Sequence, residues 1–245
     1  MKDLTWIKER MIAHRGLHSL DKTVPENSMK AFELAVEKNY GIEMDINVLK
    51  DGTVVVFHDH HLKRLVPGRT ELLSDLNFED IKDLKIWDSN EKISTLKEVL
   101  EYIDGRVPLL IELKPLGNKS FLCENFWETI KDYKGDYGIH SFSPSIVKWF
   151  KDNHPEVIRG QITEYFTSNK DMKKISKYLM KSMFFNKFTK PDFVNYGIVD
   201  LPNKYCDKAY KKGLCIIAYA SKNQEEFDLA KEHYDNSVFE YFIPR

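Results

Sequence analysis

Cysteine is scarce in this sequence, and neither sign of charge is in excess. The three cysteines, Cys123, Cys206 and Cys215, are odd in number and lack the spacing of metal ligands. We therefore expect reduced, buried thiols, and neither a disulfide framework nor a zinc site. The formal net charge is −1, which excludes a bulk attraction to nucleic acid or to an anionic membrane. Any binding of phosphate must then depend on a local arrangement of cations.

Long hydrophobic runs are also missing. No stretch approaches the roughly 20 apolar residues that cross a bilayer, and residues 1–10 carry too many charges for the apolar segment of a signal peptide. We expect a cytoplasmic protein with no stable membrane anchor and no nucleic-acid partner. No linker rich in Pro, Ser or Gly divides the chain, so residues 1–245 are expected to form a single domain. The oligomeric state stays open.

Short apolar runs typical of strands alternate with amphipathic runs typical of helices. The eight expected strands are 11–13, 41–48, 54–58, 107–113, 138–142, 157–162, 193–199 and 214–220. The expected helices are 28–38, 96–103, 143–153, 171–180, 203–212 and 224–233. This alternation favours a parallel sheet, and eight strands predict a TIM-type (β/α)8 barrel. Residues 60–94 interrupt the rhythm and predict a small insertion after strand 3, over the barrel mouth.

Acidic side chains recur at strand spacing in the first half of the chain. Glu43 and Asp45 lie two residues apart, as do Glu112 and Lys114, and residues two apart on a strand point to the same face. Paired carboxylates inside an apolar run are costly unless a cation satisfies them. Because oxygen ligands favour hard cations, Glu43, Asp45 and Glu112 are predicted to bind one divalent cation, Mg²⁺ or Ca²⁺.

Two histidines and two cations accompany these acids. His14 and His58 fall at the ends of expected strands, where barrel enzymes carry their chemistry. Two imidazoles can exchange protons near neutral pH, and Arg15 with Lys114 can neutralise the charge that grows on a phosphoryl group. Together these residues predict metal-assisted cleavage of a small-molecule phosphodiester.

The same residues resemble the signature of a known family. The matching motifs are His14-Arg15-Gly16, Pro25-Glu26-Asn27-Ser28, Glu43-x-Asp45, His58-Asp59 and Ile111-Glu112-x-Lys114. They look like those of the glycerophosphodiester phosphodiesterases, which are metal-dependent barrel enzymes with an insertion after the His-Asp pair. The resemblance implies that the three acids ligate the cation, that His14 and His58 act as general base and acid, and that Arg15 and Lys114 bind phosphate.

The resemblance weakens toward the C-terminus. Family members commonly carry Trp-Thr-x-Asn on the last strand, whereas this chain has Ala-Tyr-Ala-Ser at 218–221. An aromatic wall for the substrate would then come from Phe142 or Tyr219. Glu26 is kept as a substrate-binding residue, whereas Asn27 and Ser28 are expected mainly to begin a helix.

Two other functions remain open for this sequence. A lyase or aldolase of the Schiff-base type would use Lys114, although three carboxylates and an arginine are a poor setting for such a lysine. A barrel that binds a phosphodiester without cleaving it is the other alternative. The pair of histidines argues against it, because binding alone needs no proton transfer.

Overall fold

The computed structural model describes residues 2–245, which fall into two compact units. One unit is Ile12–Gly138, and the other joins the residues up to Met11 with Ile139–Arg245. Across the described residues, no helix is long and apolar enough to span a bilayer. The three cysteines are free and buried, as expected.

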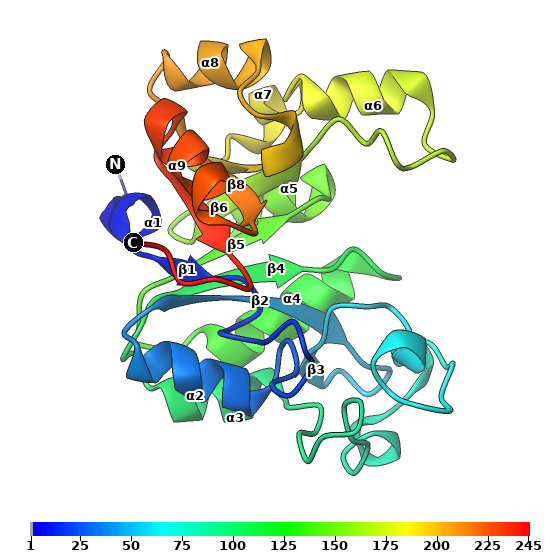
Figure 1. The fold of residues 1–245 in the computed structure, drawn as a ribbon. Helices are drawn as coiled ribbons and strands as arrows, with labels where there is room; N and C mark the ends of the chain where they lie inside the picture. Colours follow the sequence, from blue (N-terminus) through cyan, green and yellow to red (C-terminus); the bar gives the residue numbers. More distant parts are fainter. Residues whose placement is uncertain (1) are drawn as a thin grey trace. The chain divides into compact units, whose positions relative to one another are not determined.

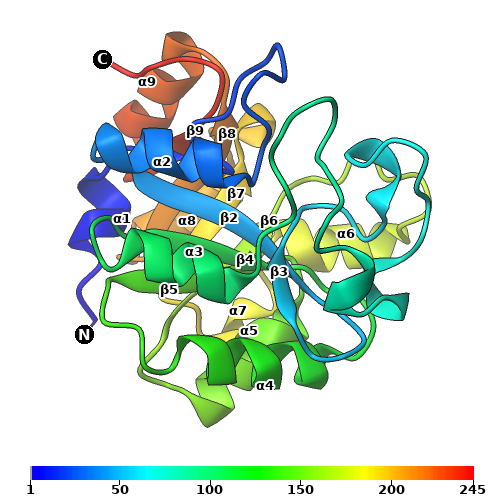
Figure 2. The same ribbon diagram turned by 90° about the horizontal axis from the view of Figure 1, so that it is seen from below.

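The unit Ile12–Gly138 is built on one long buried strand. Its strands are β1 (Ile12–Ala13), β2 (Gly41–Val48), β3 (Val54–Val56) and β4 (Leu109–Leu113), and its helices are α2 (Met29–Glu37), α3 (Leu96–Ile103) and α4 (Lys119–Ile130). β2 pairs in parallel with β1 and β4 and antiparallel with β3. The three helices lie along one face of β2 and β4 (Figures 1 and 2). Residues of both faces of β2 are buried: the apolar Ile42, Met44 and Ile46 alternate along the strand with polar residues that point to the other face.

The helices of this unit begin at polar residues that satisfy exposed amides. The Ser28 side chain accepts a hydrogen bond from the amide of Ala31 at the start of α2, as the sequence predicts. Thr95 and Glu98 form a capping box at the start of α3. Asp104 ends α3 in the left-handed conformation, with φ of 47°.

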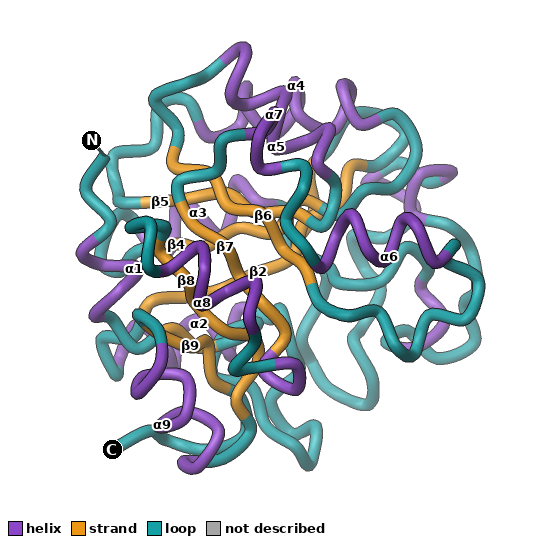
Figure 3. The backbone as a smooth tube through the Cα atoms, turned by 90° about the horizontal axis from the view of Figure 1, so that it is seen from above, coloured by secondary structure: helices purple, strands orange, loops and turns teal. Residues whose placement is uncertain are grey.

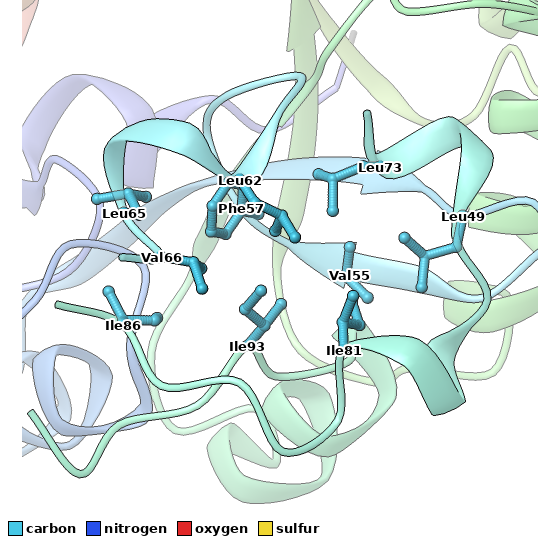
Figure 4. Packing of buried hydrophobic residues seen from close by; sticks show 10 residues of the cluster. All are labelled: Leu49, Val55, Phe57, Leu62, Leu65, Val66, Leu73, Ile81, Ile86 and Ile93. Atoms are coloured by element: carbon cyan, nitrogen blue, oxygen red, sulfur yellow. The ribbon is translucent and has the colours of Figure 1, made fainter. Parts of the chain in front are cut away.

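Residues 60–94 form an insertion with a small hydrophobic core of its own. Three 3₁₀ turns carry it: η1 (Leu62–Arg64), η2 (Leu73–Asp75) and η3 (Phe78–Asp80). Figure 4 shows Leu62, Leu65, Leu73 and Ile86 packed around Phe57 and Val55. The insertion is thus a packed element attached to β3 and not a loose loop.

The second unit contains the remaining strands and their helices. Its strands are β6 (Ile158–Thr163), β7 (Phe193–Gly197), β8 (Cys215–Ser221) and β9 (Asn236–Phe239). Its helices are α1 (Thr5–Glu9), α5 (Pro144–Asn153), α6 (Lys174–Lys181), α7 (Asn186–Thr189), α8 (Lys204–Tyr210) and α9 (Gln224–His233), with a 3₁₀ turn η4 (Ile198–Asp200). β6, β7, β8 and β9 pair in parallel in that order. In Figure 3, α5 and α9 lie beside these strands and α8 crosses in front of them.

The strand order identifies the fold. β5 (Tyr137–Ser141) spans the boundary between the two units, and the sheet runs β1-β9-β8-β7-β6-β5-β4-β2-β3, with β1 also pairing with β2. Eight strands return to their start, so the fold is a (β/α)8 barrel with β3 as an extra strand beside β2. The predicted fold class is confirmed.

One expected barrel strand is nevertheless wrong. Residues 54–58 were predicted to be the third barrel strand, but β3 is antiparallel to β2 and ends at Val56. A tight turn at Asp51-Gly52 connects the two, with Gly52 at φ of 88°, and so short a connection joins only antiparallel strands. The eighth barrel strand is β9, which follows the last predicted helix.

Candidate active site

Three buried carboxylates converge from two neighbouring strands. Asp45 on β2 is paired in register with Glu112 on β4, and Glu43 lies two residues before Asp45 on the same face. Their exposed fractions are 2% for Glu43, 0% for Asp45 and 6% for Glu112. One oxygen from each lies within 4.8 Å of the others. This is the acid cluster that the sequence predicts, and its oxygen donors fit a hard divalent cation.

Two cations lie among these acids. The Lys114 ammonium is 2.9 Å from Glu112 Oε1 and 3.3 Å from Asp45 Oδ1, and Arg15 Nε is 3.3 Å from Asp45 Oδ2. Burial opposes the charge of Lys114, but Glu112 and Asp45 raise its pKa above the ordinary value. Lys114 is therefore a permanently charged group at this site.

The three carboxylates differ in how well neighbouring cations and hydrogen bonds stabilise their negative charge. Burial and the neighbouring charge of Asp45 raise the pKa of Glu43 to about 7. Burial also acts on Asp45, but Lys114 and the other nearby cations hold its pKa well below the usual range. Glu112 Oε1 is buried and accepts no hydrogen bond of acceptable geometry, despite its ion pair with Lys114. A cation bound here would satisfy both Glu43 and Glu112.

The segment after β1 brings His14 and Arg15 to this cluster. The Arg15 amide donates to Glu43 Oε2 at 3.0 Å, and His14 Nε2 is 3.9 Å from the same oxygen. Gly16 has φ of 75°, and a Cβ there would lie 2.9 Å from the backbone of Ala31. The glycine of the motif thus lets the backbone pass close to α2.

Asn27 also holds the cluster together. Its Nδ2 donates to Asp45 Oδ2 at 2.8 Å, and its Oδ1 accepts from the Asp45 amide at 3.2 Å. The sequence assigned Asn27 mainly to the helix start, so this contact was missed. The sequence shows only that the Asn27 side chain can both donate and accept hydrogen bonds. It does not show that Asp45 is the partner.

His58 contacts Asp59, and Arg64 binds the same carboxylate. Its Nδ1 lies 2.6 Å from Asp59 Oδ1, and Arg64 donates to both Asp59 oxygens at 2.8 Å. Burial would raise the pKa of Asp59, but the hydrogen bonds from His58 and Arg64 hold it below the usual range. An ionised Asp59 can only accept, so His58 Nδ1 carries a hydrogen and donates it to Asp59.

Arg64 connects this pair to Arg15 through Glu26. The Glu26 carboxylate accepts from Arg64 Nη1 and Nη2 at 2.6 and 2.8 Å, and Glu26 Oε1 accepts from Arg15 Nη1 at 2.7 Å. Burial works against the charge of Glu26, but Arg64 and Arg15 lower its pKa. Arg64, which belongs to the insertion, is a site residue that the five motifs did not include.

Eight of the nine predicted site residues lie in the unit Ile12–Gly138. They are His14, Arg15, Glu26, Glu43, Asp45, His58, Glu112 and Lys114. Phe142 lies in the other unit, where its ring meets Phe166 and Tyr219 edge-on at centroid distances of 6.1 and 5.8 Å. Its contact with a substrate remains a prediction.

Comparison with known proteins agrees with the geometry. The model of the glycerophosphoryl diester phosphodiesterase family matches residues 14–239. The chain belongs to this family. YhdW of Bacillus subtilis is 29% identical over 224 residues, covering 88% of this chain and 87% of YhdW. The glycerophosphodiester phosphodiesterase of Caldanaerobacter subterraneus is 40% identical over 116 residues, or 44% of this chain and 46% of that enzyme.

Solved structures give the same fold. A phosphodiesterase of Oleispira antarctica, in complex with its product sn-glycerol-3-phosphate, matches with a TM-score of 0.79 at 22% identity, over 96% of this chain and 94% of the other. A structure from Silicibacter pomeroyi matches with a TM-score of 0.76 at 17% identity, over 94% and 89%. This family member is thus a phosphodiester hydrolase with a candidate acidic metal site.

Proposed function

We propose that this chain hydrolyses glycerophosphodiesters to glycerol phosphate and an alcohol with the help of one divalent cation, Mg²⁺ or Ca²⁺. The observation that carries the proposal is the convergence of Glu43, Asp45 and Glu112 within 4.8 Å. When bound, the cation supplies positive charge for the phosphoryl oxygens in the transition state. Arg15 and Lys114 add two fixed positive charges at the same place.

Glu26 acts in this proposal through Arg15. Its carboxylate already accepts hydrogen bonds from Arg15 and Arg64, and a carboxylate repels an anionic phosphodiester. We therefore assign Glu26 to holding Arg15 in place, and Arg15 to contacting the substrate. This refines the sequence prediction that Glu26 belongs to the binding site.

The two histidines move the protons. We assign His14 as the base that takes the proton of the neighbouring glycerol hydroxyl, whose oxygen then attacks phosphorus. The bond from phosphorus to the alcohol oxygen breaks, and that oxygen receives the Nε2 proton of His58, which enters the reaction with both ring nitrogens protonated and with Nδ1 bound to Asp59. Water opens the resulting cyclic phosphate with the same two groups in reversed roles, which returns each histidine to its starting state.

The test is a release assay over glycerophosphodiesters of choline, ethanolamine, glycerol and inositol, each with Mg²⁺, Ca²⁺ or Mn²⁺ and with excess chelator. We expect metal-dependent release of the alcohol, and ³¹P NMR should detect the cyclic phosphate. Full activity in chelator contradicts the metal assignment, and no turnover of any diester contradicts the proposed function.

One alternative loses support from the site geometry. A Schiff-base lysine must lose its proton, but Glu112 and Asp45 raise the pKa of Lys114. Failure of borohydride and a carbonyl compound to trap Lys114 covalently would agree with this. A barrel that binds without cleaving is tested by the release assay itself.

A further inference from the structure

Positive charge gathers in one short segment of a chain that is otherwise slightly acidic. Residues 170–190, here called the lysine segment, contain seven lysines and a single acid, Asp171, whereas the net charge of the whole chain is −1. The lysines are Lys170, Lys173, Lys174, Lys177, Lys181, Lys187 and Lys190. Within the described residues, none of them forms a salt bridge. Lys181 lies over the Tyr165 ring at 4.8 Å and Lys187 over the Phe184 ring at 5.1 Å, whereas the exposed lysines Lys170, Lys173, Lys174 and Lys190 direct their charge at solvent.

Large apolar side chains stand exposed among these lysines. Ile175 is 61% exposed, Tyr178 and Phe188 are each 53% exposed, and Phe184 is 38% exposed. Ile175 and Tyr178 are three residues apart on α6 and share one face of the helix. Scattered exposed hydrophobic residues are ordinary, but four within 14 residues, between lysines, are not.

The fold keeps this surface facing outward. Met180 and Met183 are each only 9% exposed, and Met183 packs in the core cluster with Val194 and Tyr196. The Tyr196 hydroxyl donates to the Lys181 carbonyl at 3.0 Å. α6 follows the long loop 164–173 and lies to one side of β6 and β7 (Figures 1 and 3). The lysine segment is thus anchored to the core through Met180, Met183 and the Lys181 carbonyl. A rotation of α6 that buried Ile175 and Tyr178 would break these contacts.

We propose that the lysine segment is a docking surface for an anionic lipid bilayer. A basic helix with one apolar face lies in the interface of a membrane, with its apolar side chains below the headgroups and its lysines against lipid phosphates. Lysine stems extend toward the phosphates while their carbons cover the apolar edge. The association is reversible and peripheral, and it does not depend on the catalytic assignment.

The exposed aliphatic side chain of Ile175 favours lipid over nucleic acid as the partner of this surface. Single-stranded nucleic acids also bind surfaces that combine lysines with aromatic rings, because bases stack on the rings. Ile175 is the most exposed apolar residue of the segment at 61%, and an aliphatic side chain offers no face for stacking. The same side chain gains free energy when it enters the acyl region of a bilayer.

Cosedimentation of the full chain with vesicles tests the proposal. We expect binding to phosphatidylcholine vesicles that contain phosphatidylglycerol and little binding to phosphatidylcholine alone. Binding should fall in high salt, since screening shortens the reach of the charges to a few ångström. Equal binding to both kinds of vesicle, or none to either, overturns the proposal.

Two sets of variants separate charge from insertion. Lys173→Gln/Lys174→Gln/Lys177→Gln should lower the partition coefficient about 10²-fold, and Ile175→Ser/Tyr178→Ser should lower it about tenfold or more. The matched controls are Lys208→Gln/Lys211→Gln/Lys212→Gln and Val199→Ser/Ile243→Ser, which change exposed residues of the same unit. These controls should bind like the unaltered chain.

The remaining outcomes are also decisive. All four variants should keep the far-UV circular dichroism and the turnover of a soluble glycerophosphodiester, because none alters the acid cluster. Wild-type vesicle binding by both segment variants overturns the proposal. So does tight binding of a single-stranded oligonucleotide by the unaltered chain, which would identify a nucleic acid as the partner.

Discussion

Arg64 is the residue on which the orientation of His58 depends. It holds both oxygens of Asp59 and both oxygens of Glu26. Because groups that orient a catalytic residue typically contribute about 10 to 100-fold in activity, we expect Arg64→Ala to lower kcat by that factor. Arg64→Lys should recover part of the loss, since it keeps the charge but not the planar fork.

Lys63→Ala is the matched control for Arg64→Ala. Lys63 is exposed, belongs to the same turn η1 and carries the same charge, so its removal should leave kcat unchanged. ¹⁵N NMR of the His58 ring should show the hydrogen on Nδ1 in the unaltered protein and a mixture of tautomers in Arg64→Ala. Unchanged ring signals together with an unchanged kcat would remove Arg64 from the site.

The raised pKa of Glu43 makes cation binding depend on pH. Its pKa rises from 4.5 to about 7, so below neutral pH a proton must leave before a cation binds. The affinity for Mg²⁺ or Ca²⁺ should increase from about pH 5 to about pH 7.5 and then level off. Titration calorimetry at several pH values measures this dependence.

Glu43→Gln is the test of that assignment. It should weaken cation affinity and flatten the dependence on pH, because the titrating group is gone. In the metal-free protein, stability changes with pH in the opposite direction to cation affinity. The pKa of Glu43 is higher in the folded chain than in the unfolded one, so ionisation of this carboxyl destabilises the fold. The free energy of unfolding should therefore fall between pH 5 and 7.5, as expected for a folded-state pKa above the unfolded one. A free energy of unfolding that does not change between pH 5 and 7.5 would show that Glu43 does not titrate in this range.

The histidines carry a prediction of their own. His14→Ala and His58→Ala should each lower kcat by roughly 10² to 10⁴-fold, the usual contribution of general acid and base catalysis. Steady-state kinetics on the preferred diester measure it, with circular dichroism to check the fold. A variant with nearly unaltered kcat would assign that histidine to structure.

The acid cluster could be predicted from the sequence, whereas the residues that hold the cluster and the histidines in place could not. Glu43, Asp45, Glu112 and Lys114 obey the two-residue period of a strand, and the register between β2 and β4 brings them together. Arg64 obeys no such period, because a packed insertion determines its position. Long-range partners of this kind depend on tertiary packing, which local spacing does not encode.

At the scale of elements, the errors of the sequence analysis have identifiable causes. The Asp-Gly turn at Asp51-Gly52 was the available signal for a hairpin, and it shows that residues 54–56 return antiparallel. β9 was missed because only its last two residues are apolar and its first two, Asn236 and Ser237, are buried polar residues: Asn236 donates to the carbonyls of Ile7 and Arg10. Internal hydrogen bonds replace the apolar run by which a buried strand is usually recognised.

The core of the insertion supports the turn that carries Arg64. Leu62 is fully buried at the start of η1, so Leu62→Ala should lower the free energy of unfolding by about 2 to 5 kcal/mol. It should also lower kcat, because η1 loses its support. Leu72→Ala is the control, since Leu72 is 38% exposed in the same insertion, and we expect it to cost no more than about 0.5 kcal/mol. Urea unfolding measures both.

For the whole molecule, cation binding and stability are linked. The acid cluster exists only in the folded chain, so a cation at about 100 times its dissociation constant should add about 2.7 kcal/mol to the free energy of unfolding. Tm should rise with Mg²⁺ or Ca²⁺ and fall back on addition of chelator. In Glu43→Gln the same cation concentration should raise Tm less. A Tm of the unaltered chain that does not change with the cation would contradict the predicted site.

Net charge describes only the average surface at this scale. The value of −1 argues against a bulk attraction to anionic partners, and it averages over a strongly basic segment and an acidic remainder. The expectation of no stable anchor is compatible with a reversible contact through the lysine segment. Local charge must therefore be considered alongside the total.

The contacts of Arg64 bear on how new specificity can arise in this protein. Loops at a barrel mouth are usually free to diverge while the strands preserve the chemistry. Here the insertion supplies the guanidinium that ties Asp59 to Glu26, so recognition and reactivity are encoded in one exchangeable piece of sequence. Transplanting a foreign insertion would alter both unless it brings an arginine to the same position. Adaptation to a new alcohol is then expected to proceed by single changes around a retained Arg64.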